Sequence, residues 1–458
     1  MLRPIVKLEQ QIDLGGGLWL LPESFRSKAV PFRAPVRENC VFDLRYADLT
    51  YLVRPGFVTD VIKLLGLDRI GKLFNLQFIT PYRVTGEVRP VAQAIHRFHH
   101  DRLVHSLNSA VLHAAMLNQE GINGTRLKVS VLAELVHDAM SCAGGDAMKM
   151  IDPEYFDEDR LIARFFSSRR AGWAELKRRY GLTDRTINEV HQVVNGEGWQ
   201  GQVHDITDTC SYLALDSQEL AASYAGKSRE LMSGELDNIL ALAEAGPCRI
   251  WRHVCLQDGH AVIQDVKMLY RFLELRARLY AGMYEKTDHK AVELLHTEVV
   301  FPYLFQRMAI HREELLKLDD HIFHQYVESV MEVPKLTTRI DLFGVWPRVE
   351  AYRSWEEANA RFRELAADGD FAVISDVRLF QPRKPKTDRY WVGTKNGPRS
   401  FKQAFPKEAA SVEKIFAEYL GVKRPVHLFV HPGVAKRLPR PMTMAWGQAR
   451  ERWQGQRG

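Results

Sequence analysis

Two histidines and two aspartates are spaced along this chain in a way that suits a single metal ion. They are His105, the adjacent pair His137-Asp138, and Asp208. Imidazole nitrogens and carboxylate oxygens together bind divalent first-row cations, and such an ion polarises phosphoryl oxygens and acidifies bound water. The set predicts metal-dependent hydrolysis of a phosphate ester or anhydride. These ligand types accept manganese, iron, magnesium, cobalt or zinc.

The flanking sequence predicts that the first two ligand segments are helical. Residues 91–116 contain no proline or glycine and repeat apolar residues at helical spacing, so His105 is expected inside a helix. A second helix is expected over residues 127–140. Because adjacent helical residues point about 100° apart, His137 and Asp138 can share one ion only near the edge of a groove.

A third helix is expected over residues 206–220. Within it Asp208, Tyr212 and Asp216 recur every four residues. Residues at this spacing lie on one face of a helix, so the last metal-ligand candidate shares a face with a phenol and a second carboxylate.

These motifs, taken in order, resemble those of the HD-domain phosphohydrolases, and among them the deoxynucleoside triphosphate (dNTP) triphosphohydrolases. Arg102 and His105 belong to an R-x-x-H-S-L segment of the family type. Asp208, Tyr212 and Asp216 reproduce a D-x-x-x-Y-x-x-x-D segment, and a later stretch supplies Arg276 and Tyr284 at family spacing. The likeness covers roughly residues 67–298.

The resemblance implies a helical bundle, a nucleotide substrate, release of triphosphate and a homo-oligomer. It also implies the roles of the matching residues. The metal ligands would be His105, His137, Asp138 and Asp208; the contacts to base, sugar or phosphate would come from Asn75, Arg102, Tyr212, Asp216, Arg276 and Tyr284.

The segment after the His-Asp pair departs from the family pattern. It reads HDAMSCAGGD, so Ser141 and Asp146 stand where the family has two histidines that donate protons, and Thr209 replaces a lysine. Asp146, or an acidic residue at 157–159, can act as general acid or base instead, with Arg102 as the second catalytic residue.

The chain is expected to be mainly α, in three units. Residues 1–66 form an irregular arm with a strand or hairpin, residues 67–333 the metal-binding helical bundle, and residues 334–458 a small α+β appendage. Three strands and two amphipathic helices are expected in the appendage. The strands are FAVISDVRLF, RYWVGT and VHLFVHP, and the helices are SWEEANARFRELAADG and AASVEKIFAEYLG.

Composition and cysteine usage indicate a soluble cytoplasmic protein. Hydrophobic residues make up 46% and charged residues 26%, as in globular proteins. Five cysteines without a C-x-x-C pair argue against a disulfide framework and a thiolate zinc site. The N-terminus lacks the apolar run of a signal peptide, so no membrane partner is expected.

Positive charge is concentrated at the C-terminal end. Residues 381–458 carry 17 Lys or Arg against five Asp or Glu, with aromatic residues interleaved. This mixture suits nucleic acid, through phosphate contacts and base stacking, or a regulatory nucleotide, although a solvated basic face has the same composition.

Three functions stay open on the sequence. The first is dNTP triphosphohydrolysis. The loss of the flanking histidines favours a second, nucleotide monophosphatase or phosphodiesterase chemistry at the same metal. The third is a nucleotide-sensing or nucleic-acid-binding module that has lost turnover.

Overall fold

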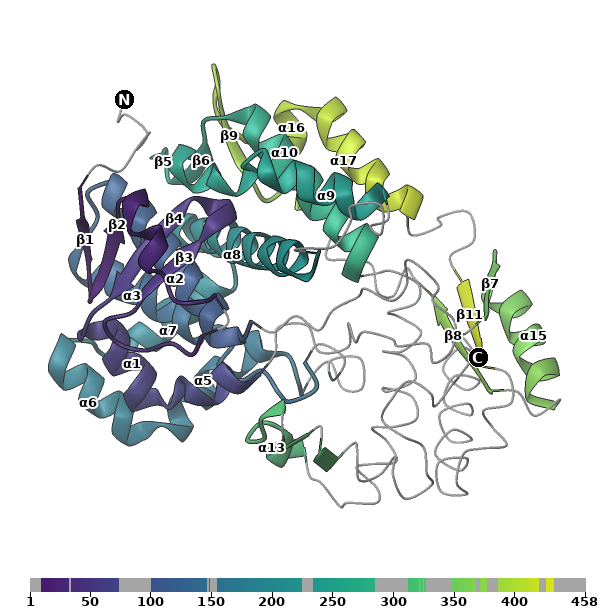
Figure 1. Cartoon of the computed structure of the whole chain (residues 1–458), viewed down its shortest axis with the longest axis horizontal. Helices are drawn as coiled ribbons and strands as arrows, with labels where there is room; N and C mark the ends of the chain where they lie inside the picture. Colours follow the sequence, from purple (N-terminus) through teal and green to yellow (C-terminus); the bar gives the residue numbers. More distant parts are fainter. Residues whose placement is uncertain are drawn as a thin grey trace.

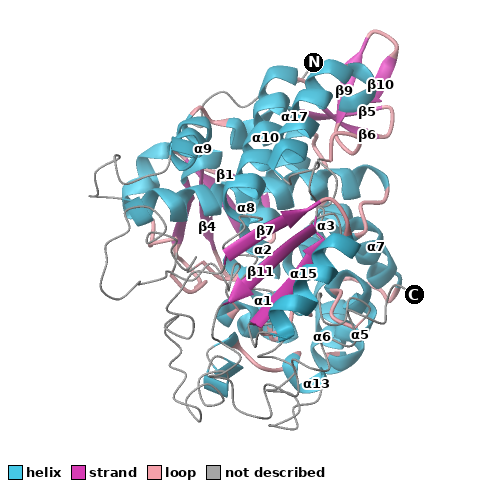
Figure 2. Ribbon diagram, turned by 90° about the vertical axis from the view of Figure 1, so that its right-hand side faces the viewer, coloured by secondary structure: helices cyan, strands magenta, loops and turns pink. Residues whose placement is uncertain are grey.

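Helices build the body of the molecule and small sheets lie at its periphery (Figure 1). The structure is a computed structural model of the chain, and it describes residues 10–32, 34–73, 100–145, 148, 155–224, 234–284, 312–320, 322–323, 325–326, 348–367, 371–376, 386–419 and 426–431. The predicted mainly α class is confirmed, with small sheets that include the expected C-terminal strands (Figure 2).

A helix buried on all sides forms the centre of the fold. Helix α2 (Arg102–Gln119) has every residue from Arg102 to Leu117 buried, which is the pattern of a helix surrounded by others. It begins later than residue 91, because extended Asp101 caps its N-terminus by accepting a hydrogen bond from the Val104 amide at 2.8 Å. Residues 91–99 lie outside the described part of the chain.

Two further helices flank α2 and carry the other ligand candidates. Helix α3 (Gly124–Val136) ends before His137, so the expected helix over residues 127–140 is four residues too long. A turn follows, in which the Ser141 amide donates to the Asp138 carbonyl. Helix α8 (Gly198–Tyr224) is longer than predicted and packs along α2. The His-Asp pair therefore lies directly after the end of α3. Its two side chains are not held about 100° apart, as they would be inside a helix.

The N-terminal region is a folded sheet rather than an irregular arm. Strands β1 (Ile12–Gly15), β2 (Leu18–Leu21), β3 (Val41–Leu44) and β4 (Leu49–Val53) form an antiparallel sheet in the order β1-β2-β4-β3. Its inward residues share one hydrophobic core with the helices. Helix α1 (Phe57–Leu65) follows and contacts α6 (Arg170–Tyr180). At this contact, a Cβ atom on Gly172 would lie 2.0 Å from the Leu64 carbonyl oxygen. Only glycine permits that approach.

The remaining helices complete the bundle. A 3-10 turn at Glu158–Leu161 leads into α5 (Ile162–Ser168), which is followed by α6. The others are α7 (Arg185–Val194), α9 (Gly234–Glu244), α10 (Val266–Leu279) with a π turn at Tyr280–Tyr284, and α13 (Arg312–Leu315). Among the described residues, no helix has the length and apolar character needed to cross a bilayer.

The C-terminal region contributes to two hydrophobic clusters. Strands β9 (Trp391–Thr394) and β10 (Gly397–Ser400) extend a hairpin of β5 (Val254–Gln257) and β6 (His260–Ile263), a pair that the sequence analysis missed. Helices α16 (Phe401–Ala404) and α17 (Pro406–Tyr419) follow, and α17 packs on α10 in the main core. Strands β7 (Arg348–Tyr352), β11 (Val426–His431) and β8 (Phe371–Asp376) form a second sheet with α15 (Trp355–Ala367).

Candidate metal centre

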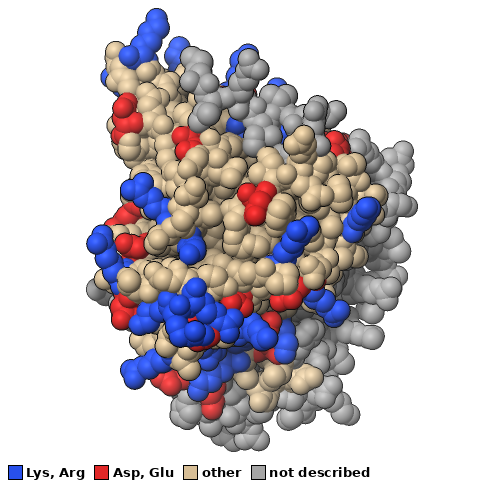
Figure 3. Space-filling model, turned by 90° about the vertical axis from the view of Figure 1, so that its left-hand side faces the viewer, with Lys and Arg blue, Asp and Glu red and all other residues tan. Residues whose placement is uncertain are grey.

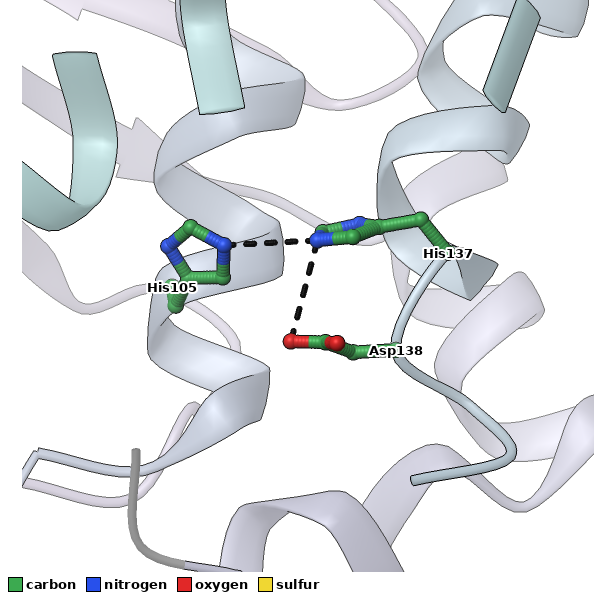
Figure 4. A group of neighbouring side chains, drawn as sticks. All are labelled: His105, His137 and Asp138. Carbon is green, nitrogen blue, oxygen red and sulfur yellow. Dashed lines mark hydrogen bonds and ion pairs between the residues drawn. The ribbon is translucent and has the colours of Figure 1, made fainter. Parts of the chain in front are cut away.

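Three of the four predicted metal ligands meet in a buried cluster between α2 and the turn after α3. One ligand atom from each of His105, His137 and Asp138 lies within 4.8 Å of the other two (Figure 4). The Nε2 atoms of the two imidazoles are 3.3 Å apart, and His137 Nε2 is 3.7 Å from Asp138 Oδ2. All three residues are buried, so their polar atoms face one another instead of water.

The fourth predicted ligand approaches the same point from α8. Asp208 Oδ1 lies 3.2 Å from His105 Nε2 and 3.8 Å from His137 Nε2. Burial alone would raise the pKa of Asp208, but its hydrogen bond to His105 and the charge of Lys386 hold that pKa well below the usual range. The carboxylate is therefore anionic, as metal coordination requires.

The outer hydrogen bonds of both imidazoles orient their Nε2 atoms toward the cluster. His137 Nδ1 donates to the Glu134 carbonyl oxygen at 2.7 Å. His105 Nδ1 lies 3.0 Å from Ser211 Oγ, which donates to the His105 carbonyl oxygen at 2.9 Å, so Ser211 can accept the Nδ1 proton when Nε2 binds a cation. Such outer partners fix the tautomer of a metal-binding histidine. Two opposed lone pairs beside two carboxylates fit a divalent cation.

The pKa of His137 also indicates that the cluster stabilises positive charge. Burial opposes a proton on this imidazole, but the Asp138 carboxylate outweighs that effect and the pKa of His137 is raised. A metal ion would take the place of that proton. The donor set, two imidazoles and two carboxylates, favours a first-row divalent ion over a thiolate-preferring one.

Arg102 and Ser141 hold the Asp138 carboxylate from the other side. Arg102 Nη1 donates to Asp138 Oδ1 at 2.7 Å, and Ser141 Oγ donates to the same oxygen at 3.2 Å. Both residues are buried. Arg102 thus lies at the metal cluster, whereas the Ser141 hydroxyl is committed to a ligand.

A second polar layer behind the cluster was missed in the sequence analysis. Glu134 is fully buried and accepts from His113 Nδ1 at 2.7 Å, His204 Nδ1 at 2.9 Å and Thr207 Oγ1 at 2.8 Å. The His204 ring packs edge-on against His137, with centroids 5.4 Å apart. Despite burial, Glu134 raises the pKa of His204 to about 9. The spacings Glu134/His137 and His204/Asp208 were the local signals for this layer.

The predicted sugar and phosphate contacts form a buried group on α8 and α10. Arg276 Nε donates to the Tyr212 hydroxyl at 2.9 Å, and the guanidinium lies 4.6 Å from the Tyr280 ring centroid. The Tyr284 hydroxyl donates to Asp216, and burial raises the pKa of Asp216 to about 6. Arg276 is 1% exposed, which excludes a solvated helix face for this residue.

A lysine from the C-terminal region reaches the same stretch of α8. Lys386 Nζ lies 2.8 Å from Asp205 Oδ1 and 3.3 Å from Thr209 Oγ1. The Tyr390 hydroxyl also bonds to Thr209, at 3.1 Å. Lys386 is buried, so this member of the basic region faces the interior. No local pattern links it to α8, because the two segments are far apart in the sequence.

Two predicted site residues lie outside the described part of the chain. Asn75 and Asp146 are both among the residues whose structure is not described. Their roles in substrate contact and proton transfer stay predictions.

Comparison with known proteins finds a shared fold and no sequence relative. No protein-family model matches the sequence, and no curated protein matches it. Among solved structures, the chain is similar to a phosphohydrolase from Bacteroides thetaiotaomicron VPI-5482, with a TM-score of 0.56 and 12% sequence identity. The match covers 85% of this chain and 99% of that one. At this identity the likeness is one of fold.

Proposed function

We propose that this protein is a metal-dependent phosphohydrolase of nucleotides, and in particular that it hydrolyses a dNTP to a deoxynucleoside and triphosphate. The observation that carries the proposal is the convergence of His105, His137, Asp138 and Asp208 on one point with oriented lone pairs. The fold shared with a phosphohydrolase supports it independently of the ligand residues.

The chain's own groups supply orientation and charge for phosphoryl chemistry. A divalent cation bound at the cluster supplies Lewis-acid activation of the phosphoryl group and of the attacking water. Arg102 donates to Asp138 and orients that carboxylate toward the cluster, and a guanidinium group at this position suits a phosphate oxygen of the substrate. Glu134 keeps His204 protonated beside His137, so positive charge lies where the transition state gains negative charge.

The size of the polar group on α8 supports a nucleotide as substrate. Asp208, Tyr212 and Asp216 follow one another by four residues, which corresponds to about 6 Å per step along the helix axis. A ligand with a phosphate at Asp208 would thus extend its sugar toward Tyr212 and Asp216. Arg276, held against Tyr212, adds a cation with the planar fork that phosphate prefers.

Lys386 compensates for the family lysine that Thr209 replaces. Its ammonium contacts the Thr209 hydroxyl and lowers the pKa of Asp208 through its charge. A cation is therefore present beside the last metal ligand even though the local sequence lacks one. This supports the binding of a highly charged substrate such as a triphosphate.

One observation favours a different phosphoester as the second candidate. The hydroxyl of Ser141, which stands where the family has a histidine, is bound to Asp138 and does not offer a proton to a leaving group. The residue that stands in place of the family's proton donor is thus unavailable for that role, which favours nucleotide monophosphatase or phosphodiesterase chemistry at the same metal, with the leaving oxygen protonated by another group.

Product analysis tests the proposal. Purified protein with manganese is incubated with dNTPs, NTPs, monophosphates and cyclic nucleotides, and the products are resolved by anion exchange. Deoxynucleoside plus triphosphate is the expected result. Orthophosphate or a monophosphate as product would support the second candidate, a nucleotide monophosphatase or phosphodiesterase. Absence of turnover with bound metal would favour a nucleotide-sensing module.

A further inference from the structure

A cavity of about 130 Å³ lies behind the turn that carries Asp138. It opens between α5, the 3-10 turn at Leu67–Lys72, the residues that follow Asp138, and α13. Ala139 and Met140 form part of its wall. The cavity is therefore separated from the metal cluster by a single turn of chain, and it contains none of the predicted metal or substrate residues.

Four cations and one carboxylate line this cavity, so it carries excess positive charge. Arg69 lies half-buried at the bottom, and the exposed Arg164, Arg169 and Lys317 surround the mouth with Glu313 as the single acidic lining residue. Arg164 is paired with Glu313 at 2.9 Å. The other three cations have no carboxylate within ion-pair distance among the described residues.

The two innermost arginines are held by neutral carbonyl groups. Arg69 donates to the carbonyl oxygens of Leu318 at 3.2 Å, Ala139 at 2.9 Å and Ser141 at 2.7 Å. Arg169 Nε donates to the Leu65 carbonyl oxygen at 3.1 Å. These bonds fix the directions of both guanidinium groups without neutralising them. Burial is the main reason that the pKa of Arg69 falls to about 10, and the group stays charged at neutral pH.

On the nearby basic face of α6, unlike in the cavity, most cations are paired with carboxylates. Lys and Arg side chains gather there in Figure 3, but carboxylates are interspersed among them. Lys177 pairs with Asp184 at 2.7 Å, and both Arg178 and Arg179 bond to Glu175 at 2.6 Å. The charge of that face is largely compensated, whereas the charge of the cavity is not.

We infer that this cavity binds a phosphate-type oxyanion and that the bound anion stabilises the turn carrying Asp138. Guanidinium groups bind such anions through paired N–H donors, and the mouth is open to solvent so that a free phosphate or the phosphate of a larger ligand can enter. Arg69 connects the cavity to the metal cluster, because it also holds the carbonyls of Ala139 and Ser141, and the Ser141 hydroxyl bonds to Asp138. The inference does not depend on which substrate the metal centre uses.

Calorimetric titration of the full-length, metal-free protein tests the binding. Orthophosphate, tripolyphosphate and dATP are the probes, and metal removal prevents them from binding at the metal cluster. The double variant Arg169→Gln/Lys317→Gln is expected to bind orthophosphate at least about tenfold more weakly than the wild type, because it loses two charged donors. Tighter binding of dATP than of orthophosphate that is lost in the double variant would identify a nucleotide as the source of the anion, and equal binding of the two would identify the phosphate group alone.

Two charge-matched comparisons keep this test decisive. The control Lys63→Gln/Arg170→Gln removes two exposed cations near the cavity that do not line it, and it should bind orthophosphate like the wild type. Circular dichroism and thermal melting establish that all variants are folded. Absence of saturable binding to the wild-type protein, or equal affinity in the cavity variant and the control, would overturn the inference.

The coupling to the metal centre is tested by metal affinity. Manganese is titrated into the protein with and without saturating sulfate, an oxyanion that competes little for the ion. By reciprocity of linked equilibria, an anion that stabilises the Asp138 turn tightens manganese binding, here by an expected several-fold. The effect should vanish in Arg169→Gln/Lys317→Gln. An unchanged manganese affinity in the wild type would refute the coupling.

Discussion

His105 and His137 point their Nε2 atoms at each other across 3.3 Å, and the outer nitrogen of each ring has a hydrogen-bond partner of its own. Two lone pairs at this distance repel unless a proton or a cation lies between them. His105 lies within α2 and His137 at the end of α3, and both residues are buried. We therefore regard the pair as a preformed half of a metal site, completed by Asp138 and Asp208.

The substitution Asp138→Asn should abolish metal binding and turnover together. The amide keeps a hydrogen-bond acceptor for Arg102 but removes the negative charge that a divalent ion requires. Metal content by plasma mass spectrometry and product formation are the measurements. Asp184→Asn, which removes an exposed surface carboxylate, is the control and should leave both unchanged. Full activity of metal-free Asp138→Asn protein would eliminate the proposed centre.

Ser211→Ala should weaken metal binding without removing a ligand. Ser211 is placed to accept the Nδ1 proton of His105, which leaves the Nε2 lone pair for a metal ion. Loss of such an outer partner typically weakens metal affinity by about 10–100-fold. Ser217→Ala is a matched control on the same helix, since Ser217 is equally buried but, within the described part of the chain, bonds only to the Leu213 carbonyl. Equal manganese affinities in the two variants would show that Ser211 does not orient His105.

The convergence of the candidate ligands could be predicted from sequence because they lie within helices, or directly after a helix, whose periodicity is readable. The sequence placed His105 and Asp208 on helices and identified the His-Asp pair, and the structure brings all of them together. The helix ends were less predictable. Asp101 fixes the first turn of α2 through a single capping hydrogen bond. The turn after Val136 is held by hydrogen bonds from Arg69, a residue distant in sequence that no local pattern indicates.

Long-range pairings account for what the sequence did not reveal. Lys386 joins the site from a segment remote from α8, and the N-terminal strands are too short to signal a four-stranded sheet. The β5–β6 hairpin was not predicted, because its two strands are only four residues long and β6 ends directly before Asp265, which caps α10. Each of these features depends on partners distant in sequence, which periodicity does not encode.

Tyr212→Phe should impair substrate binding more than metal binding. The variant removes the hydroxyl that accepts from Arg276 Nε, so the guanidinium loses a fixed partner next to the metal cluster. We expect KM for the nucleotide to rise about tenfold, with metal content unchanged, as for the loss of one hydrogen bond to a charged group. Tyr270→Phe is the control, because that hydroxyl lies at the surface near Ser411. An unchanged KM in Tyr212→Phe would show that the Tyr212 hydroxyl does not contribute to substrate binding.

The stability of the metal-free protein should fall as pH rises through about 9. The folded-state pKa of His204 is about 9 and therefore above the unfolded value, so its stabilising contribution is full below about pH 6.5 and is lost as the imidazole deprotonates in the folded protein. Urea unfolding at pH 6.5, 8 and 9.5 measures the effect, expected to reach at most about 3 kcal/mol. His204→Gln should lack this pH dependence, and exposed His191→Gln should retain it. A flat wild-type profile would contradict a charged His204–Glu134 pair.

Lys386→Met should lower turnover while metal stays bound. The variant removes the ammonium beside Asp205 and Thr209, and with it the positive charge that acts on Asp208. It also leaves the Asp205 carboxylate poorly compensated, so a stability loss of up to about 3–5 kcal/mol is expected from breaking a buried pair. The double variant Lys386→Met/Asp205→Asn should recover much of that stability but none of the turnover, which separates folding from function. Lys402→Met, which breaks an exposed pair with Glu413, is the matched control and should retain full activity. Recovery of turnover in the double variant would assign Lys386 a purely structural role, because only the neutralisation of Asp205 would then matter.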